Sequence, residues 1–405
     1  MRIFFCLLFI CFCMFYSCRQ KKTVERAESK EPALYTIDLD SIKTVDSIKM
    51  SSIFGKARAI ILEETDYSLI GGISKFQVFD NYVFVLDRNG AKKLFVFDKK
   101  NGKYLRQIGS LGQGPGEYIE IRDFCLDVAN REVYIYDPGK HRLHKYNMDN
   151  GKYVESVNMQ HNDRFFHFIM YLNNRIYANI LKSDKLLAEL DIETSVYREF
   201  LNADEYNCGW SESIFMAYSS FFISDLDSPK FVELLMPTVI SIDETGLRPY
   251  LTVKSKDWVQ KSDVNGDDEQ TRSMQFGLDL ISKRRAYCIQ NYMEFGDYIC
   301  FDYRRGFLFF VVFNKKTGEA FQCNKINLKP DLLTAGGAYF SLLFPFTTVK
   351  NAYGLWHYYN ANSRTKIQLT EEQIAKDLEN REELIKTLQS RKDDEFYVIF
   401  EYEFK

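Results

Sequence analysis

The residues most suggestive of ligand chemistry form a glycine-rich stretch, Gly109 to Tyr118, with the sequence GSLGQGPGEY. Glycine-rich loops cradle phosphates when they follow the pattern G-x-x-x-x-G-K-[ST] and open a helix, because free amides and a lysine then face the anion. Gly109 and Gly114 have this spacing, but Pro115 and Gly116 stand where lysine and serine or threonine are required. The run that follows alternates like a strand, so no helix N-terminus faces the loop. The sequence therefore argues against a phosphate site.

We interpret the same stretch as a connection between two units of a β-structure. Its glycines allow close backbone approach, and the Glu117 carboxylate can accept hydrogen bonds from backbone amides. A contact with a ligand on one face of the protein is the alternative role. The residues that define the loop are Gly112, Gly114, Pro115, Gly116, Glu117 and Tyr118.

Histidines and acidic residues offer only weak metal-binding patterns. His141 and His144 are the one close pair among five histidines. On a strand their side chains would point to opposite faces, and only a turn could bring them to one ion. Asp263 to Glu269 (DVNGDDE) resembles the start of a calcium loop, but Asp268 replaces the glycine at the sixth position and Met274 the glutamate at the twelfth. We therefore expect a solvated polar loop there, with no metal and no cofactor.

Aromatic residues are abundant, and two tryptophans lie outside the segments that look like regular strands. Aromatics make up 16% of the chain, with 26 tyrosines, and most of them fit packing between strands. Trp210 and Trp258 fall in loop-like segments. Since an exposed indole can stack on the apolar face of a sugar ring, the hypothesis is that both tryptophans lie on a ligand-binding face.

The N-terminus has the order of a secretory signal. Arg2 supplies a positive charge, Ile3 to Phe15 form an apolar run of thirteen residues, and Cys18 follows the small Ser17. Such a run is too short to span a bilayer comfortably, and a cysteine after a small residue resembles the bacterial lipobox. We therefore predict a signal peptide over residues 1–17 and an acyl chain on Cys18 that tethers the mature protein. An uncleaved anchor and plain secretion are the alternatives.

Charge and cysteine content argue against two classes of protein. Removing residues 1–17 lowers Lys+Arg from 53 to 52 against 56 acidic residues, so the mature net charge is −4. That balance gives no basic field for nucleic acid. The cysteines beyond the signal are odd in number and widely spaced, which favours buried thiols over a disulfide framework. They are Cys125, Cys208, Cys288, Cys300 and Cys323.

The elements that must position these residues repeat along the chain. Six segments share an alternating strand, an Asp or Asn, a polar turn and a second strand: LFVFDKKNGKYLRQI, LHKYNMDNGKYVESV, LAELDIETSVYREF, VISIDETGLRPYLTV, FVVFNKKTGEAFQC and WHYYNANSRTKIQL. Asx residues cap their own turns and glycine accepts positive φ, so each segment predicts a hairpin. The Asx positions are Asp98, Asn147, Asp191, Asp243, Asn314 and Asn360, spaced by 49, 44, 52, 71 and 46 residues. Six such units predict an all-β fold, the six-bladed β-propeller.

The C-terminal region contains the one helical pattern and a final strand. Thr370 to Gln373 form a capping box. The apolar residues expected on one face of the helix are Ile374, Leu378, Ile385 and Leu388. The last segment, EFYVIFEYEFK, alternates like a half-buried strand. We expect it to close the ring by pairing with N-terminal strands such as residues 59–62, because closure removes exposed sheet edges.

The run from Lys56 to Tyr118 carries a family resemblance. It resembles the first blade of the six-bladed β-propeller lipoproteins of Bacteroidetes-type bacteria, with G-Q-G-P-G-E-Y as the most specific signature. The helix followed by a strand rich in Tyr and Phe is similar too. The resemblance implies one propeller over residues 33–405. The segment before it is charged and free of aromatics, which predicts a solvated, lipid-anchored tether over residues 18–32. The resemblance implies no catalytic residue, because the family supplies no established set.

Three functional interpretations fit these observations. The leading one is a lipid-anchored, non-enzymatic binding or scaffold module that presents one face to a glycan, a peptide or an envelope protein. The second is an extracytoplasmic hydrolase or lyase whose metal ligands come from separate blades and meet in the channel. The third is a structural subunit of an envelope complex. We expect a monomer on the periplasmic side of the outer membrane, because the RQKK after Cys18 lacks the acidic residues of surface-export signals.

Overall fold

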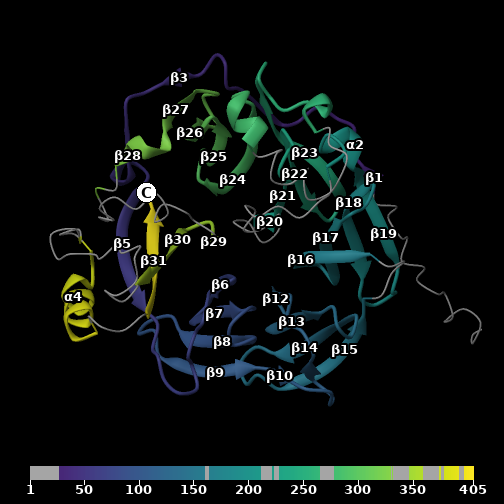
Figure 1. Cartoon of the computed structure of the whole chain (residues 1–405), viewed down its shortest axis with the longest axis vertical. Helices are drawn as coiled ribbons and strands as arrows, with labels where there is room; N and C mark the ends of the chain where they lie inside the picture. Colours follow the sequence, from purple (N-terminus) through teal and green to yellow (C-terminus); the bar gives the residue numbers. More distant parts are fainter. Residues whose placement is uncertain are drawn as a thin grey trace, which may run out of the picture.

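The alternating segments of the sequence form antiparallel strands grouped into six sheets around a central axis (Figure 1). These sheets are the blades of a propeller, which confirms the all-β, six-bladed fold expected from the repeat. In this computed structural model the described residues are 27–159, 164–210, 221–222, 228–264, 278–329, 331, 346–358, 374, 378–391 and 396–405.

In each blade the first strand lies nearest the axis and the last lies at the rim (Figure 1). Blade 1 consists of β6 (Lys75–Phe79), β7 (Tyr82–Asp87), β8 (Lys93–Asp98) and β9 (Tyr104–Ile108). Blade 2 consists of β12 (Asp123–Asp127), β13 (Glu132–Asp137), β14 (Arg142–Asn147) and β15 (Tyr153–Asn158). Blade 3 consists of β16 (Phe165–Leu172), β17 (Arg175–Leu181), β18 (Lys185–Asp191) and β19 (Tyr197–Asn202).

The second half of the ring follows the same order. Blade 4 consists of β20 (Phe221–Phe222), β21 (Lys230–Phe231), β22 (Thr238–Asp243) and β23 (Gly246–Lys254). Blade 5 consists of β24 (Ala286–Phe295), β25 (Tyr298–Arg305), β26 (Phe307–Asn314) and β27 (Ala320–Asn324). Blade 6 consists of β29 (Phe346–Thr347), β30 (Asn351–Tyr358), β31 (Phe396–Phe404) and β5 (Phe54–Ile61). Short helices are α2 (Ala203–Tyr206), η2 (Lys261–Asp263) and η3 (Lys325–Asn327).

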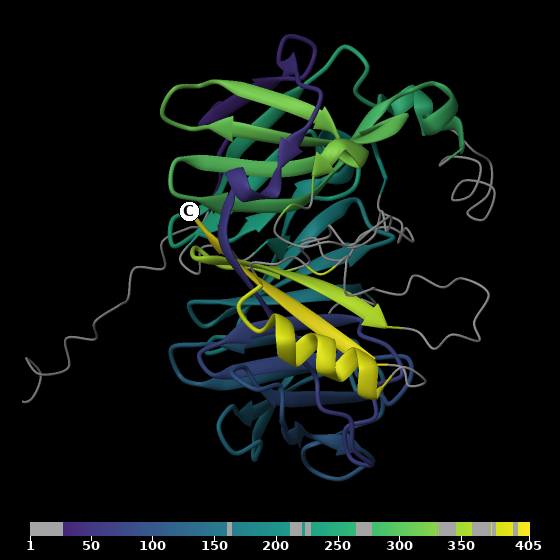
Figure 2. The same cartoon turned by 90° about the vertical axis from the view of Figure 1, so that its left-hand side faces the viewer.

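The N-terminal segment forms a strap around the outside of blades 4, 5 and 6 (Figures 1 and 2). It pairs in parallel with the rims of blades 4 and 5 and with a short strand that follows blade 5, and then enters blade 6 as β5, so it covers sheet edges that would otherwise be open. Its elements are β1 (Ala27–Glu28) and β2 (Tyr35–Asp38) on β23, β3 (Lys43–Thr44) on β27, β4 (Ile48–Lys49) on β28 (Leu328–Lys329), and η1 (Met50–Ser52).

The start of the strap corrects one part of the prediction that residues 18–32 form a solvated tether, whereas residues 18–26 lie outside the described residues. From Ala27 onward the chain is docked on the propeller, as β1. The Glu28 carboxylate accepts hydrogen bonds from the Tyr206 hydroxyl at 2.6 Å and the Leu201 amide at 3.2 Å. A two-residue parallel strand has no alternation to reveal it, so composition alone suggested a tether.

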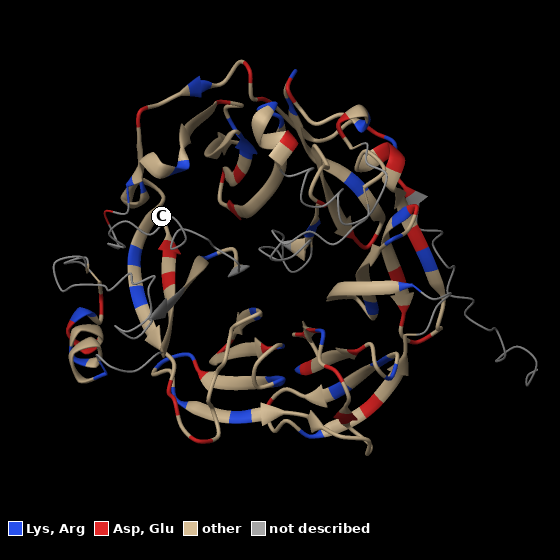
Figure 3. Cartoon of the chain, in the orientation of Figure 1, with Lys and Arg blue, Asp and Glu red and all other residues tan. Residues whose placement is uncertain are grey.

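The last strand closes the ring as predicted. β31 pairs with β30 on one side and β5 on the other, with Phe400 opposite Ala59. Acidic residues of β31 face basic residues of β5 across this seam (Figure 3). Glu401 lies 2.9 Å from Arg58 and 2.6 Å from Lys99 of blade 1. The pKa of Glu401 lies below its ordinary value. Burial alone would raise this pKa, but the hydrogen bonds from Lys99 and Arg58 outweigh the effect of burial.

The C-terminal helix is shorter than the sequence predicts. The helix α4 spans Arg381–Ser390 and contains Ile385 and Leu388, whereas the capping box at residues 370–373 lies outside the described residues. Leu378 precedes the helix and forms a parallel bridge to Ala57, so the expectation of one continuous helix face is wrong. All four apolar residues nevertheless enter the same hydrophobic cluster beside blade 6. Their spacing suits that cluster without requiring a helix.

The predicted Asx positions cap their turns in every blade where the structure describes them. The oxygen acceptors are Asp98, Asn147, Asp191, Asp243 and Asn314. Asp98 accepts hydrogen bonds from the amides two and three residues further on, at 2.9 and 3.0 Å. Gly102 then ends that turn at φ +69°, and Gly318 does the same in blade 5 at φ +75°. Asn360 lies outside the described residues.

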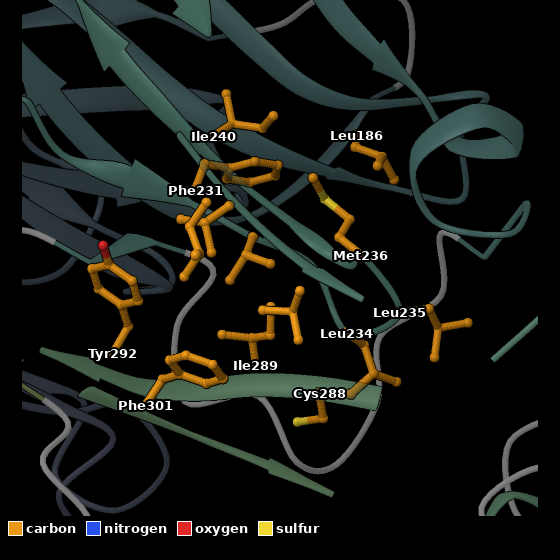
Figure 4. Close-up of a cluster of buried hydrophobic side chains, with 14 of the residues drawn as sticks. Leu186, Phe231, Leu234, Leu235, Met236, Ile240, Cys288, Ile289, Tyr292 and Phe301 are labelled. Carbon is orange, nitrogen blue, oxygen red and sulfur yellow. The ribbon is translucent and has the colours of Figure 1, made fainter. Parts of the chain in front are cut away.

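Hydrophobic side chains pack between neighbouring blades. The largest cluster joins blades 3, 4 and 5 and includes Phe231 and Ile240 beside Ile289 and Phe301 (Figure 4). Burying one such side chain contributes roughly 1.5–3 kcal/mol. Smaller clusters join the other neighbouring blades, so apolar burial holds the blades together along the full ring.

The cysteines follow the prediction of buried thiols. All five described cysteines are unpaired, and four of them are buried, in β12, β24, β25 and β27. Burial raises the pKa of Cys288 and of Cys323 to about 11. These thiols stay protonated at neutral pH, which makes them poor nucleophiles.

Candidate functional site

The glycine-rich loop connects β9 of blade 1 to β12 of blade 2. Inside it, β10 (Ser110–Leu111) pairs in parallel with β11 (Glu117–Tyr118). The Glu117 carboxylate accepts a hydrogen bond from the Gly114 amide at 2.8 Å. A Cβ at Gly112 would lie 2.1 Å from the same carboxylate, so a side chain there would push Glu117 away. The loop folds around its own glutamate.

Packing around this loop places it at the rim. Gly116 has φ +72°, and a Cβ there would lie 2.5 Å from the ring of Tyr153. The Tyr146 hydroxyl donates to the Gly116 carbonyl at 2.9 Å, and Tyr118 is fully buried with its hydroxyl 3.2 Å from the Lys92 carbonyl. Tyr146 and Tyr153 belong to the outer strands of blade 2. The loop therefore fastens two blades at the rim and does not line the axis.

Both tryptophans are buried, so their predicted place on a ligand-binding face is wrong. Trp210 is 2% exposed and Trp258 is 5% exposed, both within the cluster that joins blades 3, 4 and 5. The Trp258 indole donates to the Leu235 carbonyl at 3.0 Å. Loop-like flanking sequence did not indicate exposure, because these segments pack under the propeller surface.

The histidine pair does not form a metal site. His141 is exposed on a turn, whereas His144 is 3% exposed within β14. His144 Nδ1 lies 2.8 Å from Ser156 Oγ, and Nε2 lies 3.4 Å from Asp137 Oδ2. Ser156, His144 and Asp137 follow one another in the order of a Ser-His-Asp catalytic triad. However, the Asp137 carboxylate also accepts hydrogen bonds from three backbone amides, and the Ser156 hydroxyl also contacts Tyr153. The contacts brace β13, β14 and β15 against one another.

Five polar residues from blades 1, 2 and 3 meet beside the axis, and we name them the axial cluster. They are Lys75, Arg88, Arg122, Asp123 and His167. Lys75 Nζ donates to Asp123 at 2.9 Å and to the Phe124 carbonyl at 2.7 Å. A guanidinium nitrogen of Arg88 lies 3.0 Å from His167 Nε2. Because Arg88 follows a strand of blade 1 and His167 belongs to blade 3, this contact crosses blade 2 at its inner end, where β6, β12 and β16 converge (Figure 1).

The strands fix these residues at one end of the ring. Lys75 and Asp123 are the first residues of β6 and β12, and Arg122 directly precedes β12. Arg88 directly follows β7, which runs antiparallel to β6. We name this end, where the innermost strands begin, the entry face. Loops on a rigid scaffold of this kind are common places for binding.

Positive charge dominates the axial cluster. Burial, together with the repulsion of a proton by Arg88, Arg122 and Lys75, lowers the pKa of His167 to about 4. The imidazole is therefore neutral at pH 7 and accepts a hydrogen bond from Arg88. Burial and the charge of Arg122 also lower the pKa of Arg88, against the attraction of Asp123 and Glu120. The three cations of the cluster outnumber Asp123 and the neighbouring Glu120, so one net positive charge remains.

The sequence of the propeller matches one known protein family. The family described as a domain of unknown function (DUF4934) matches residues 34–401, which is most of the chain. The chain belongs to the DUF4934 family. Among curated proteins, none matches it.

Two solved structures are similar to this DUF4934 chain at low sequence identity. One is a Bacteroides fragilis NCTC 9343 protein described as exported, with 15% identity, 92% of this chain and 99% of that chain covered, and a TM-score of 0.65. Another is a member of the DUF4221 family from Bacteroides vulgatus, with 12% identity, 87% and 97% coverage, and a TM-score of 0.48. The first similarity supports the propeller architecture.

The DUF4934 chain also contains a repeated loop anchor that the sequence analysis missed. Asp87 and Asp137 end the second strands of blades 1 and 2, and both are fully buried. Asp87 accepts the amides of Gly71, Gly72, Gly90 and Ala91, so it ties the incoming loop to the next turn. The sequence does contain a sign of this anchor, because an Asp ends the alternating strand in both VFVLD and VYIYD.

The described part of the DUF4934 propeller has neither a cluster of metal-binding groups nor a membrane-spanning helix. There, no group of three or more His, Cys, Asp or Glu could hold a metal ion. No helix in that part has the length and apolar character needed to cross a bilayer. Asp263, the first residue of the calcium-like stretch, is paired with Arg285 at 3.0 Å, and residues 265–277 lie outside the described ranges.

Proposed function

We propose that this DUF4934 propeller is a non-enzymatic binding module of the cell envelope that presents its entry face to a glycan, a peptide or an envelope protein. The axial cluster is the observation that carries the proposal. Polar side chains from three blades touch one another there, on strands whose positions are fixed by interblade packing. A rigid scaffold loses little freedom on binding, which favours affinity.

The envelope location rests on the N-terminal pattern and on the exported Bacteroides fragilis neighbour. An acyl group on Cys18 would be joined to the docked strap by only nine residues, 18–26, because β1 begins at Ala27. Nine residues reach at most about 30 Å. Because the strap begins on the rim of blade 4, the lipid would hold the propeller by its rim and leave the entry face free, on the periplasmic side of the outer membrane.

Lipidation is tested by the substitution Cys18→Ala. The variant should lose acyl-label incorporation and leave the membrane fraction, because the proposed lipid can no longer be attached. Retention of Cys18→Ala in membranes, with the apolar run uncleaved, would contradict the proposed anchor.

Binding is tested by presenting the mature chain without its lipidated Cys18, residues 19–405, to glycan arrays and peptide libraries. Hydrogen exchange with the best binder should show protection in segments 74–77, 120–124 and 165–169, which surround the axial cluster. The rim strands β9, β15 and β19 serve as the internal control and should exchange unchanged. A footprint confined to those rim strands would contradict binding at the entry face.

A further inference from the structure

We infer that the axial cluster binds an oxyanion group of the ligand, namely a carboxylate, a sulfate or a phosphate. The inference rests on the proposed function, because it names the chemical class that the entry face recognises. Arg88, Arg122 and His167 would contact the anion, while Lys75 and Asp123 hold the strands that carry them.

Arg88 is the central observation. Its guanidinium is half-buried, and within the described residues no acid lies at ion-pair distance from it. Its side chain contacts the neutral His167 ring at 3.0 Å, which offers an acceptor but no charge. A guanidinium has five donors in a planar fork that matches an oxyanion, and a partly buried cation without a counter-ion is unfavourable. An anion would supply both the missing charge and the missing acceptors.

Asp123, one of the two acids that attract Arg88, is already paired. Asp123 Oδ2 accepts hydrogen bonds from Lys75 at 2.9 Å and from the Ile169 amide at 2.7 Å. Its side chain is 2% exposed, and Lys75 is 13% exposed. This pair is satisfied between blades 1, 2 and 3, and it cannot turn to Arg88 without leaving the Ile169 amide unpaired. The positive charge of Arg88 therefore stays available.

Two further buried polar atoms near the cluster lack partners within the described part of the chain. Arg122 binds Glu120 through one terminal nitrogen, but its buried Nε has no hydrogen-bond acceptor there. Gln77 lies two residues after Lys75 on β6, hence on the same face of the strand, and is 4% exposed. Its Oε1 has no donor among the described residues. A ligand with an anionic group and a hydroxyl would satisfy these atoms.

Anion binding should be coupled to protonation of the His167 ring. Arg88, Arg122 and Lys75 are the charged groups that act on its ring, and all three lower its pKa. An anion beside Arg88 would offset their charge and raise the pKa of His167. Binding should therefore strengthen as the pH falls from neutral towards about 4, the pKa of the free ring.

The test is calorimetric titration of the mature chain with sodium sulfate, sodium phosphate and sodium glucuronate at constant ionic strength. At least one probe should bind, and Arg88→Gln should weaken it by at least about tenfold, as expected for a lost charge-assisted hydrogen bond. Arg142→Gln is the matched control, because Arg142 is exposed on β14 and its loss changes the net charge equally. That control should bind like the wild type. Arg88→Lys should retain part of the affinity if Arg88→Gln proves unstable.

The outcomes separate this inference from the proposed function. Absence of binding by all three probes, or equal loss in Arg88→Gln and Arg142→Gln, would overturn the oxyanion site. If the array instead yields an uncharged binder that protects the entry face and ignores Arg88→Gln, the oxyanion inference fails while the binding module stands. If Arg88→Gln lowers only the melting temperature, the axial cluster is a brace between blades and the inference is wrong.

Discussion

Replacing Gly102 by alanine probes the contact between the first blade and the ring-closing strand. Gly102 lies in the turn after β8 at φ +69°, and a Cβ there would stand 1.9 Å from the Ile61 carbonyl oxygen of β5. Two glycines occupy the same place in other blades. Gly151 has φ +68° with the Gln107 carbonyl oxygen 3.3 Å away, and Gly318 has φ +75° with nothing within 4 Å.

The three sites separate backbone strain from steric contact. Left-handed backbone should cost each alanine variant about 1 kcal/mol, because φ is nearly equal at all three. At Gly102 the clearance of 1.9 Å must also grow to at least 3.0 Å, a shift of 3.0 − 1.9 = 1.1 Å between two backbones. Overpacking of this kind costs about 1–3 kcal/mol more. We therefore expect losses of about 1 kcal/mol for Gly318→Ala and about 2–4 kcal/mol for Gly102→Ala, with Gly151→Ala between them.

Urea unfolding of the three variants, followed by tryptophan fluorescence and circular dichroism, measures these losses. The comparison is made between midpoints at a shared slope, since the variants should expose the same surface on unfolding. Equal midpoints for Gly102→Ala and Gly318→Ala would refute the close packing of the blade 1 turn on β5, and with it the described ring closure.

Further predictions concern the ends of the chain and pH. Truncation after Ser390 removes β31 and should give an insoluble or strongly destabilised protein, because β30 and β5 lose their shared partner; a soluble product that melts cooperatively would place ring closure elsewhere. Deleting residues 19–26 should leave the urea midpoint unchanged. Glu28→Ala should lower the free energy of unfolding by about 1–2 kcal/mol, because the hydrogen bonds from Tyr206 and the Leu201 amide are lost. Equal urea midpoints for the two variants would show that the strap is not docked through Glu28. The pKa of His167 is depressed from 6.5 to about 4, so the folded state binds fewer protons than the unfolded state between these values. Stability should therefore fall as the pH drops from 6.5 towards 4, by at most about 3 kcal/mol, and His167→Gln should flatten that part of the profile; identical profiles would contradict the buried neutral ring.

Much of the fold could be predicted because its signals are local. Alternating strands and Asx turns recur within single segments, and each described Asx position caps a turn. Ring closure followed from the final strand having no hairpin partner nearby. The strap was missed because its parallel pairs are two to four residues long and depend on distant rims. The helix boundary was misplaced because Ile374 and Leu378 join the same apolar cluster without being helical.

The candidate site could not be predicted in the same way. Arg88 and His167 are separated by 79 residues, and only the curvature of the ring brings them together. Neither residue lies in a recognisable sequence motif. The glycine-rich loop, which looked most like a binding site in the sequence, instead connects blades 1 and 2 at the rim. The tryptophans misled for a related reason, since burial depends on neighbouring blades and not on the residues beside them in sequence.

The most direct test of the account follows the His167 ring by NMR while sodium sulfate, sodium phosphate or sodium glucuronate is added to the mature chain. In the free protein the His167 pKa should lie near 4. Saturation with a binding probe should raise that pKa, while the amide signals of the rim strands β9, β15 and β19 serve as the internal control and should not respond. In Arg88→Gln the free His167 pKa should already be higher, and the response to the probe should vanish. A free His167 that titrates near its ordinary value of 6.5, or that ignores all three probes, would contradict the axial cluster as the binding site.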